Sequence, residues 1–185
     1  MRGMNGFTLI ELLVTLAILV IAVTVAMPSY SALVQRQQMT TAVNDMVHLL
    51  TFARQESMRR QKLVTVCPSA DQSNCASDWN LPLIVFADHD RNEVRDSGEP
   101  LLRVFTPHSS GLWTFNRDYL QYQPSGMING SNGSLLYCPE SRSARYARML
   151  FVSLGGRVRL SQDSNNDGIH ENSNRAPLNC DGADL

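Results

Sequence analysis

One polar stretch of this sequence has the oxygen-bearing residues and the spacing of a calcium-binding loop. The stretch contains Asp88, Asp90, Asn92, Asp96 and Glu99, which stand at the ligand positions of an EF-hand loop. Glu93, however, occupies the position where that loop needs glycine, and no helix is predicted on either side. We therefore favour a solvated turn rich in Asp and Asn. No metal is expected, and these five residues are kept as weak calcium candidates.

A second acidic stretch lies nearer the C-terminus and is also incomplete. Asp163, Asn165 and Asp167 precede Gly168 and fit the opening half of a calcium loop, but Asn174 replaces the closing glutamate. We interpret it in the same way, as a polar turn.

Arginine is concentrated in another part of the chain. Five arginines fall between positions 142 and 159: Arg142, Arg145, Arg148, Arg157 and Arg159. A guanidinium binds phosphate through two parallel hydrogen bonds and keeps its charge, so Arg148, Arg157 and Arg159 are candidate DNA contacts. Arg157 and Arg159 are two apart on a predicted strand and should point to one face of the sheet. The alternative is that the arginines pair with acidic residues of the tail or of neighbouring proteins.

Four cysteines, Cys67, Cys75, Cys138 and Cys180, predict two disulfides in an exported domain. Three connectivities are possible, and closeness favours Cys67 with Cys75 and Cys138 with Cys180. The cysteines include no C-x-x-C pair, and the histidines lack the spacing of a zinc site. The chain has 16 Lys and Arg against 17 Asp and Glu, so its overall charge does not indicate nucleic-acid binding.

The N-terminal region combines a long apolar run with one acidic residue. Between Phe7 and Met27 the only charged side chain is Glu11. About twenty helical residues cross the hydrocarbon of a bilayer, so the run is long enough to span it. A carboxylate there costs about 2.5 to 3.5 kcal/mol on insertion scales and usually has a partner. The nearest cation would be an amine at Phe7, created only if the chain were cut after Gly6. A secretory signal peptide would leave Glu11 unexplained.

This N-terminal pattern resembles the leader of type IV prepilins and type II pseudopilins. The resemblance implies that prepilin peptidase cuts between Gly6 and Phe7 and N-methylates Phe7. It also implies that Glu11 pairs with the N-terminus of a neighbouring subunit, and that Pro28 kinks the helix, as in many pilins.

The elements that would carry these residues follow from the apolar pattern. Apolar residues recur at three- and four-residue steps beyond Pro28, which predicts an amphipathic helix at 29–62. The helical pattern includes Leu33, Ala42, Val43, Met46, Leu49, Leu50 and Ala53. Short strands are predicted at 63–67, 81–86, 101–105, 112–115, 120–123, 133–138, 147–153 and 157–161, followed by an irregular tail.

The predicted fold class is α+β, with a long N-terminal helix packed against a C-terminal antiparallel β-sheet domain. The domains are a leader at 1–6, a transmembrane and filament-core helix at 7–28, the amphipathic helix at 29–62 and a β-rich domain at 63–185. This order, with Trp79, residues 122–126 and residues 152–159, resembles the GspH/FimT/FimU family of minor pilins and pseudopilins.

What the resemblance implies about function is a non-enzymatic filament subunit. Nucleophile elbow, Walker loop, zinc-protease helix and dinucleotide-binding glycines are all missing from the sequence, so no catalytic residue and no cofactor is expected. The implied protein is inserted in the inner membrane in a single pass, with a periplasmic C-terminal domain, and later joins the filament.

The implied partners are prepilin peptidase and other minor and major pilins, in a tip or priming complex that supports pilus biogenesis, twitching or adhesion. Residues 156–159 are similar to the motif with which FimT-type pilins hold DNA, so a DNA receptor for natural transformation is an alternative. A pseudopilin of type II secretion is another.

Overall fold

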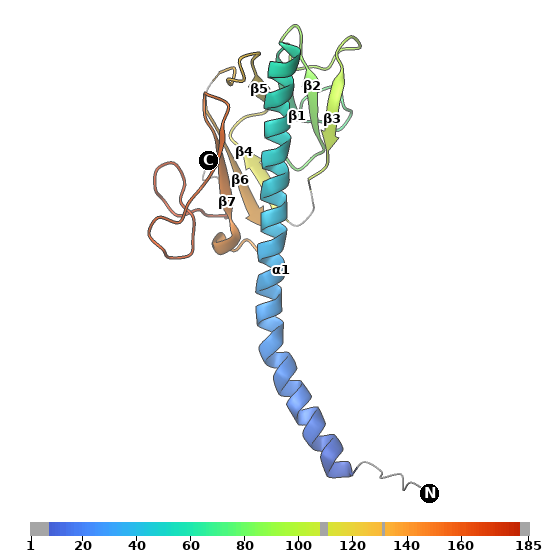
Figure 1. Cartoon of the computed structure of the whole chain (residues 1–185), viewed down its shortest axis with the longest axis vertical. Helices are drawn as coiled ribbons and strands as arrows, with labels where there is room; N and C mark the ends of the chain where they lie inside the picture. The colour runs from blue at the N-terminus through green and yellow to red at the C-terminus, as the bar shows by residue number, and fades with distance from the viewer. Residues whose placement is uncertain (1–7, 108–110, 131, 182–185) are drawn as a thin grey trace, which may run out of the picture. The chain divides into compact units, whose positions relative to one another are not determined.

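The computed structural model describes residues 8–107, 111–130 and 132–181, without the side chains at 25, 26, 28 and 29. The chain divides into a first unit that ends at Gln37 and a second unit that begins at Gln38. One helix, α1 (Leu9–Arg60), runs through this boundary, and all the strands described belong to the second unit (Figure 1). The α+β class with one long N-terminal helix is confirmed.

The first unit is helical from Leu9 onward. Its helix begins after Thr8, whose side-chain oxygen accepts a hydrogen bond from the backbone N–H of Glu11 at 3.3 Å. A threonine followed three residues later by glutamate is the capping-box pattern, and it explains locally why α1 begins here. The backbone of Pro28 lies inside α1, so the helix is assigned without a break at that residue.

A membrane-spanning segment is the sequence expectation for residues 7–28. In the part of the chain that the structure describes, no helix is long and apolar enough to cross a membrane. The predicted cleavage junction of Gly6 and Phe7 lies outside the described residues.

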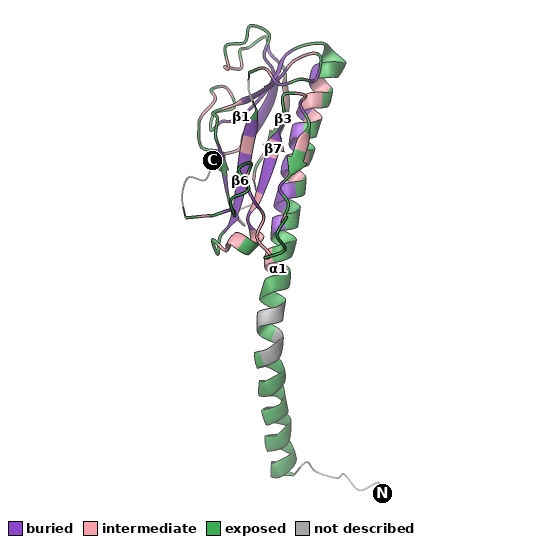
Figure 2. Cartoon of the chain, turned by 90° about the vertical axis from the view of Figure 1, so that its left-hand side faces the viewer, coloured by how far each residue is buried: buried purple, intermediate pink, exposed green. Residues whose placement is uncertain are grey.

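The second unit is built around the later turns of α1. One stripe of the helix is buried at three- and four-residue steps, as the apolar pattern predicts. The buried stripe consists of Met39, Ala42, Val43, Met46, Leu49, Leu50 and Ala53. Figure 2 shows this stripe turned towards the strands of the same unit. Leu33, predicted to belong to it, is 62% exposed, because the described core begins only at Met39.

Helix α1 ends in a capped turn that directs the chain into the first strand. Gln61 adopts a left-handed φ of 54°, and the backbone N–H of Lys62 bonds to the carbonyl of Ser57 at 3.3 Å. This six-to-one bond is the Schellman pattern, which closes a helix and reverses the chain.

The strands form two antiparallel sheets, a number that the sequence pattern had left unspecified. In the first sheet the order is β3 (Leu101–Phe105), β2 (Leu83–Ala87), β1 (Val64–Pro68) and β5 (Leu120–Tyr122). In the second sheet it is β4 (Gly111–Phe115), β6 (Gly133–Pro139), β7 (Arg148–Val152) and β8 (Val158–Leu160). A short 3-10 helix, η1 (Ala144–Tyr146), precedes β7. Residues from both sheets join the stripe of α1 in one core.

Each disulfide holds an irregular segment over the outer face of one sheet. Cys67 pairs with Cys75, and Cys67 packs with Ile84 and Phe86 in a small cluster behind the first sheet. Cys138 pairs with Cys180, which brings the tail over the second sheet. There Leu178 of the tail is buried in a cluster with Leu136, Cys138, Ala147 and Met149. The connectivity favoured by closeness is therefore confirmed.

Two tight turns are fastened to the end of α1 by Arg54. Its Nε donates to the carbonyl of Gly126 at 2.9 Å, and its Nη2 donates to the carbonyl of Gly155 at 3.1 Å. Gly126 and the neighbouring Gly156 both have positive φ, at 77° and 72°. Residues 122–126 and 152–159, which the sequence marks as family motifs, are thus largely turns that meet on α1.

Candidate functional site

The carboxylate of Glu11 stands alone on an apolar helical surface. Glu11 is exposed, and its side chain has no partner among the described residues. From Leu9 to Met27 the large apolar side chains that the structure describes are between 43% and 77% exposed. A surface of this size and polarity is the kind that another apolar body covers. The first unit therefore presents an apolar binding surface with one acidic group near its start.

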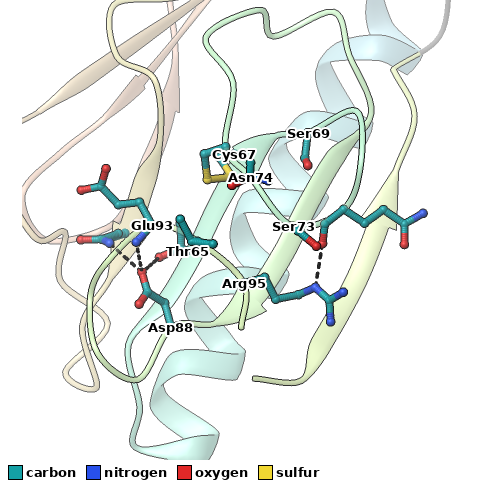
Figure 3. The surroundings of a disulfide bond; sticks show 12 residues. Thr65, Cys67, Ser69, Ser73, Asn74, Asp88, Glu93 and Arg95 are labelled. Carbon is teal, nitrogen blue, oxygen red and sulfur yellow. Dashed lines mark hydrogen bonds between the residues drawn. A yellow bond between two sulfur atoms is a disulfide. The ribbon is translucent and has the colours of Figure 1, made fainter. Parts of the chain in front are cut away.

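Carboxylates of the acidic loop between β2 and β3 accept hydrogen bonds that hold the loop in place. Asp88 is fully buried, and its Oδ2 accepts hydrogen bonds from Thr65 at 2.8 Å and from Gln121 at 3.0 Å (Figure 3). Its Oδ1 accepts from the backbone N–H of Arg91 at 2.7 Å. The Asp88 side chain thus ties the loop to β1 and β5. This burial was not foreseen from the sequence, where Asp88 resembles any other polar loop residue.

The residues of the predicted calcium loop do gather, in part. Ligand oxygens of Asp88, Asp90 and Glu99 lie within 4.8 Å of one another. The Asn92 amide donates to Asp90 at 2.9 Å and to Asp96 at 3.1 Å. The buried carboxylate of Glu99 accepts hydrogen bonds from the backbone N–H groups of residues 89 and 96. These bonds give the carboxylates a structural role, and calcium binding stays an untested prediction.

Glu93 stands at the position where an EF-hand loop has glycine, and it adopts a turn conformation there. Its φ is 65°, in the left-handed region, and its backbone N–H reaches Oδ2 of Asp88 at 3.4 Å. A hydrogen bond with the Glu93 side chain raises the pKa of Tyr119. Glu93 therefore adopts the left-handed backbone conformation for which an EF-hand loop uses glycine.

The second acidic loop, which begins at Asp163, also contains a residue of positive φ whose N–H bonds to the first aspartate of the loop. Gly168 has a φ of 88°, and its N–H donates to Oδ2 of Asp163 at 2.9 Å. Beside the loop, His170 contacts the Ser161 hydroxyl at 3.0 Å through Nδ1. Burial, together with the positive charge of Arg148, lowers the pKa of His170.

The structure separates the three arginines that were proposed to contact DNA. Arg148 is paired with Tyr137 across β6 and β7, and its Nη1 donates to the carbonyls of Arg145 and Ala147 at 3.0 and 2.6 Å. Arg148 is thus held by backbone at the start of β7. Arg157 and Arg159 instead are exposed and line one cleft of about 630 Å³ on the outer face of the second sheet. The prediction that these two share a face is confirmed.

This outer cleft contains two basic groups and the aromatic ring of Phe151. The guanidinium of Arg159 lies 5.6 Å from the ring centroid of Phe151, a cation–π contact. Neither the guanidinium of Arg157 nor that of Arg159 has a hydrogen-bonded or ion-paired partner among the residues that the structure describes. None of the described residues that line the cleft is Asp or Glu. An anionic group would therefore meet uncompensated positive charge there.

A neighbouring cleft of about 400 Å³ adds a residue that sequence reasoning missed. It shares Phe151, Arg159 and Ser173 with the outer cleft and brings in Arg175 from the tail. Arg175 lies far along the chain in a segment without strand or helix pattern, so only the folded tail places it here. The buried Glu171 also lines this second cleft, and its carboxylate accepts the backbone N–H of Ser164 at 2.9 Å.

Two protein-family models match the chain. The model described as "Type II transport protein GspH" matches residues 42–170. The model described as "Prokaryotic N-terminal methylation motif" matches residues 1–27, which include Gly6, Phe7 and Glu11.

Individual relatives come from Pseudomonas aeruginosa. A curated "Fimbrial protein" is 34% identical over 71 residues, which are 38% of this chain and 46% of the relative, so the match spans less than half of that protein. The crystal structure of the type IV minor pilin FimU superposes with a TM-score of 0.56 at 17% identity, over 78% of this chain and 96% of FimU. A second crystal form of FimU gives 0.54, over 76% and 98%. At this identity the structural likeness concerns the fold.

Proposed function

The chain belongs to the GspH family of type II transport proteins, and from that membership we propose that it is a minor pilin of a type IV pilus. Prepilin peptidase would cut between Gly6 and Phe7 and methylate Phe7. The mature chain would then join other minor and major pilins, in a tip or priming complex that supports pilus biogenesis, twitching or adhesion. The N-terminal methylation motif supports the processing step.

One observation carries this proposal: the apolar surface between Leu9 and Met27 is exposed and includes a single charged residue, Glu11. In a filament core, the apolar side chains would pack against the same segment of other subunits. The Glu11 carboxylate would neutralise the N-terminal amine of an adjoining subunit. Pairing matters because an unpaired carboxylate in an apolar environment is costly, while a paired one is tolerated.

Before assembly, the protein would reside in the inner membrane in a single pass, with its C-terminal domain in the periplasm. The two disulfides support an oxidising compartment for residues 63–185, since such bonds persist outside the cytoplasm. A role as a pseudopilin of type II secretion is the related alternative. Loss of secretion without loss of pili in a deletion strain would favour that alternative.

The test replaces Glu11 by glutamine and, separately, by alanine in the source cell. Glutamine still suits the third position of a capping box, so Glu11→Gln keeps the cap and removes the charge. We expect both variants to be made and retained in membranes, yet to be reduced at least about tenfold in sheared filaments, since each loses a pair worth more than about 1.4 kcal/mol. Immunoblotting of the filament fraction measures this.

The two substitutions separate charge pairing from helix capping. Normal incorporation of Glu11→Gln together with failure of Glu11→Ala would assign Glu11 to the cap. Normal incorporation of both variants would contradict any role of Glu11 in assembly.

A second candidate function is DNA binding through the outer cleft. The observation that favours it is the exposed, unpaired state of Arg157 and Arg159. Such contacts would be independent of sequence and sensitive to salt. In a gel-shift assay with the full chain in detergent, DNA should be retarded at low salt, and an Arg157→Ala, Arg159→Ala double variant should retard it less. No retardation, or equal retardation by the variant, rules this function out.

A further inference from the structure

Strand β8 is an edge strand whose outward backbone groups are available. It pairs with β7 on one side and ends the second sheet. The N–H of Ser153 bonds to the carbonyl of Arg157 at 3.0 Å, and the N–H of Ser161 bonds to the carbonyl of Met149 at 2.7 Å. In an antiparallel ladder, such bonds recur at every second pair. Arg159 therefore turns its backbone groups towards β7, while Val158 and Leu160 turn theirs away from it.

The side chains of β8 divide the edge into two chemically different faces. Arg159 pairs with Phe151 and lines the outer cleft together with Arg157. Val158 and Leu160 alternate to the other face, where Leu160 pairs with the fully buried Leu150. Leu160 is nonetheless 39% exposed, because no further strand of the described chain covers it. The edge is thus basic on one face and apolar on the other.

We propose that β8 receives an extended segment of a partner protein in which acidic and apolar residues alternate. The segment would add a fifth strand to the second sheet, with its main chain bonded to Val158 and Leu160. Its acidic side chains would face Arg157 and Arg159, and its apolar side chains would cover Leu160. Side chains of a strand point alternately to its two faces. A segment that matches the basic face and the apolar face of β8 must therefore alternate acidic and apolar residues.

The positive charge of Arg157 and Arg159 favours an acidic strand as the partner of β8 and disfavours a second copy of β8. Two β8 strands placed side by side would bring four guanidinium groups together, and none of the described residues that line the outer cleft is a carboxylate. Like charges placed opposite each other across strands are destabilising, and basic edges discourage self-pairing. The same arginines attract a strand of opposite charge. The recognised partner is therefore a different, acidic segment.

This recognition goes beyond the proposed filament role, since it uses the sheet and not the apolar helix surface. It also competes with DNA binding, because both would use Arg157 and Arg159. A test must therefore measure hydrogen bonding by the main chain of β8, because DNA phosphates bound to the two arginines would form no hydrogen bonds with it.

The test uses the full chain in detergent and the peptide acetyl-Val-Glu-Val-Glu-Val-Glu-Val-amide. We expect saturable binding by fluorescence anisotropy and slower amide hydrogen exchange at Val158 and Leu160. An Arg157→Glu, Arg159→Glu double variant should bind about tenfold more weakly, as two exposed ion pairs allow. Leu160→Pro removes one outward N–H at an edge that tolerates proline, and it should also weaken binding. Arg142→Glu, which reverses one charge at an exposed site outside both clefts, is the charge-reversal control and should bind normally.

Four outcomes would overturn the proposal. They are binding without protection of Val158 and Leu160, equal binding of a peptide with lysine in place of glutamate, equal binding by the double variant, and no binding by the wild type. If double-stranded DNA binds the same arginines while the peptide does not, the outer cleft is a phosphate site.

Discussion

Gly156 occupies a place where a side chain has no room. A Cβ there would lie 2.0 Å from the carbonyl oxygen of Gly126, and the φ of 72° is one that side-chain-bearing residues rarely adopt. A Cβ at the neighbouring Gly155 would come no nearer than 4.0 Å to another group, the Oγ of Ser153. The two adjacent glycines therefore differ in kind: one is needed by the fold, and the other only supplies a carbonyl to Arg54.

We predict that Gly156→Ala lowers the free energy of unfolding by about 2 to 4 kcal/mol, from backbone strain and overpacking. Gly155→Ala should change it by less than about 1 kcal/mol. Denaturant unfolding of the full chain in one detergent measures both. Equal effects of the two substitutions would show that the turn does not pack on Gly126 as described.

The disulfides act at the scale of elements, because each closes a loop of different length. The Cys138–Cys180 bond spans 42 positions and holds the tail, whereas the Cys67–Cys75 bond spans 8. In the chain-entropy model, the longer loop contributes about 4 kcal/mol and the shorter about 2.5 kcal/mol.

Replacing Cys138 and Cys180 by serine should therefore destabilise the chain more than replacing Cys67 and Cys75. It should also speed amide exchange around Leu178, which the bond holds against the second sheet. Hydrogen-exchange mass spectrometry of the two double variants reports both effects. The comparison fails if the Cys67 and Cys75 variant is the less stable one.

The elements could be predicted from the sequence where local pattern decides them. The stripe of α1 follows from apolar spacing, and the strands follow from short β-branched and aromatic runs between polar turns. The pairing of β1 with β5 could not be found this way, because it joins segments far apart in the chain. The number of sheets stayed unspecified for that reason.

Single sites were predictable to the extent that they depend on neighbours in sequence. Arg157 and Arg159 share a face because they are two apart, whereas the Arg148 side chain is held by the carbonyls of Arg145 and Ala147. The burial of Asp88 depends on Thr65 and Gln121, which come from other strands. Arg175 reaches the second cleft only through the fold of the tail.

At the scale of the whole molecule, the two units differ in how far their apolar residues are buried. The second unit buries most of its large apolar residues in its own core, and disulfide-held segments cover part of its outer faces. The first unit leaves its apolar residues exposed along a helix that bears one carboxylate. In the function proposed above, this exposed apolar surface is the one that would pack against the same segment of other subunits.

The central claim, that this chain is cut, methylated and built into a filament, can be tested by one measurement. Filaments sheared from the source cells are digested, and the N-terminal peptide of this chain is identified by mass spectrometry. We expect a peptide that begins at a methylated Phe7, with residues 1–6 removed. Recovery of a chain that still begins at Met1, or absence of the chain from filaments that are otherwise assembled, would contradict it.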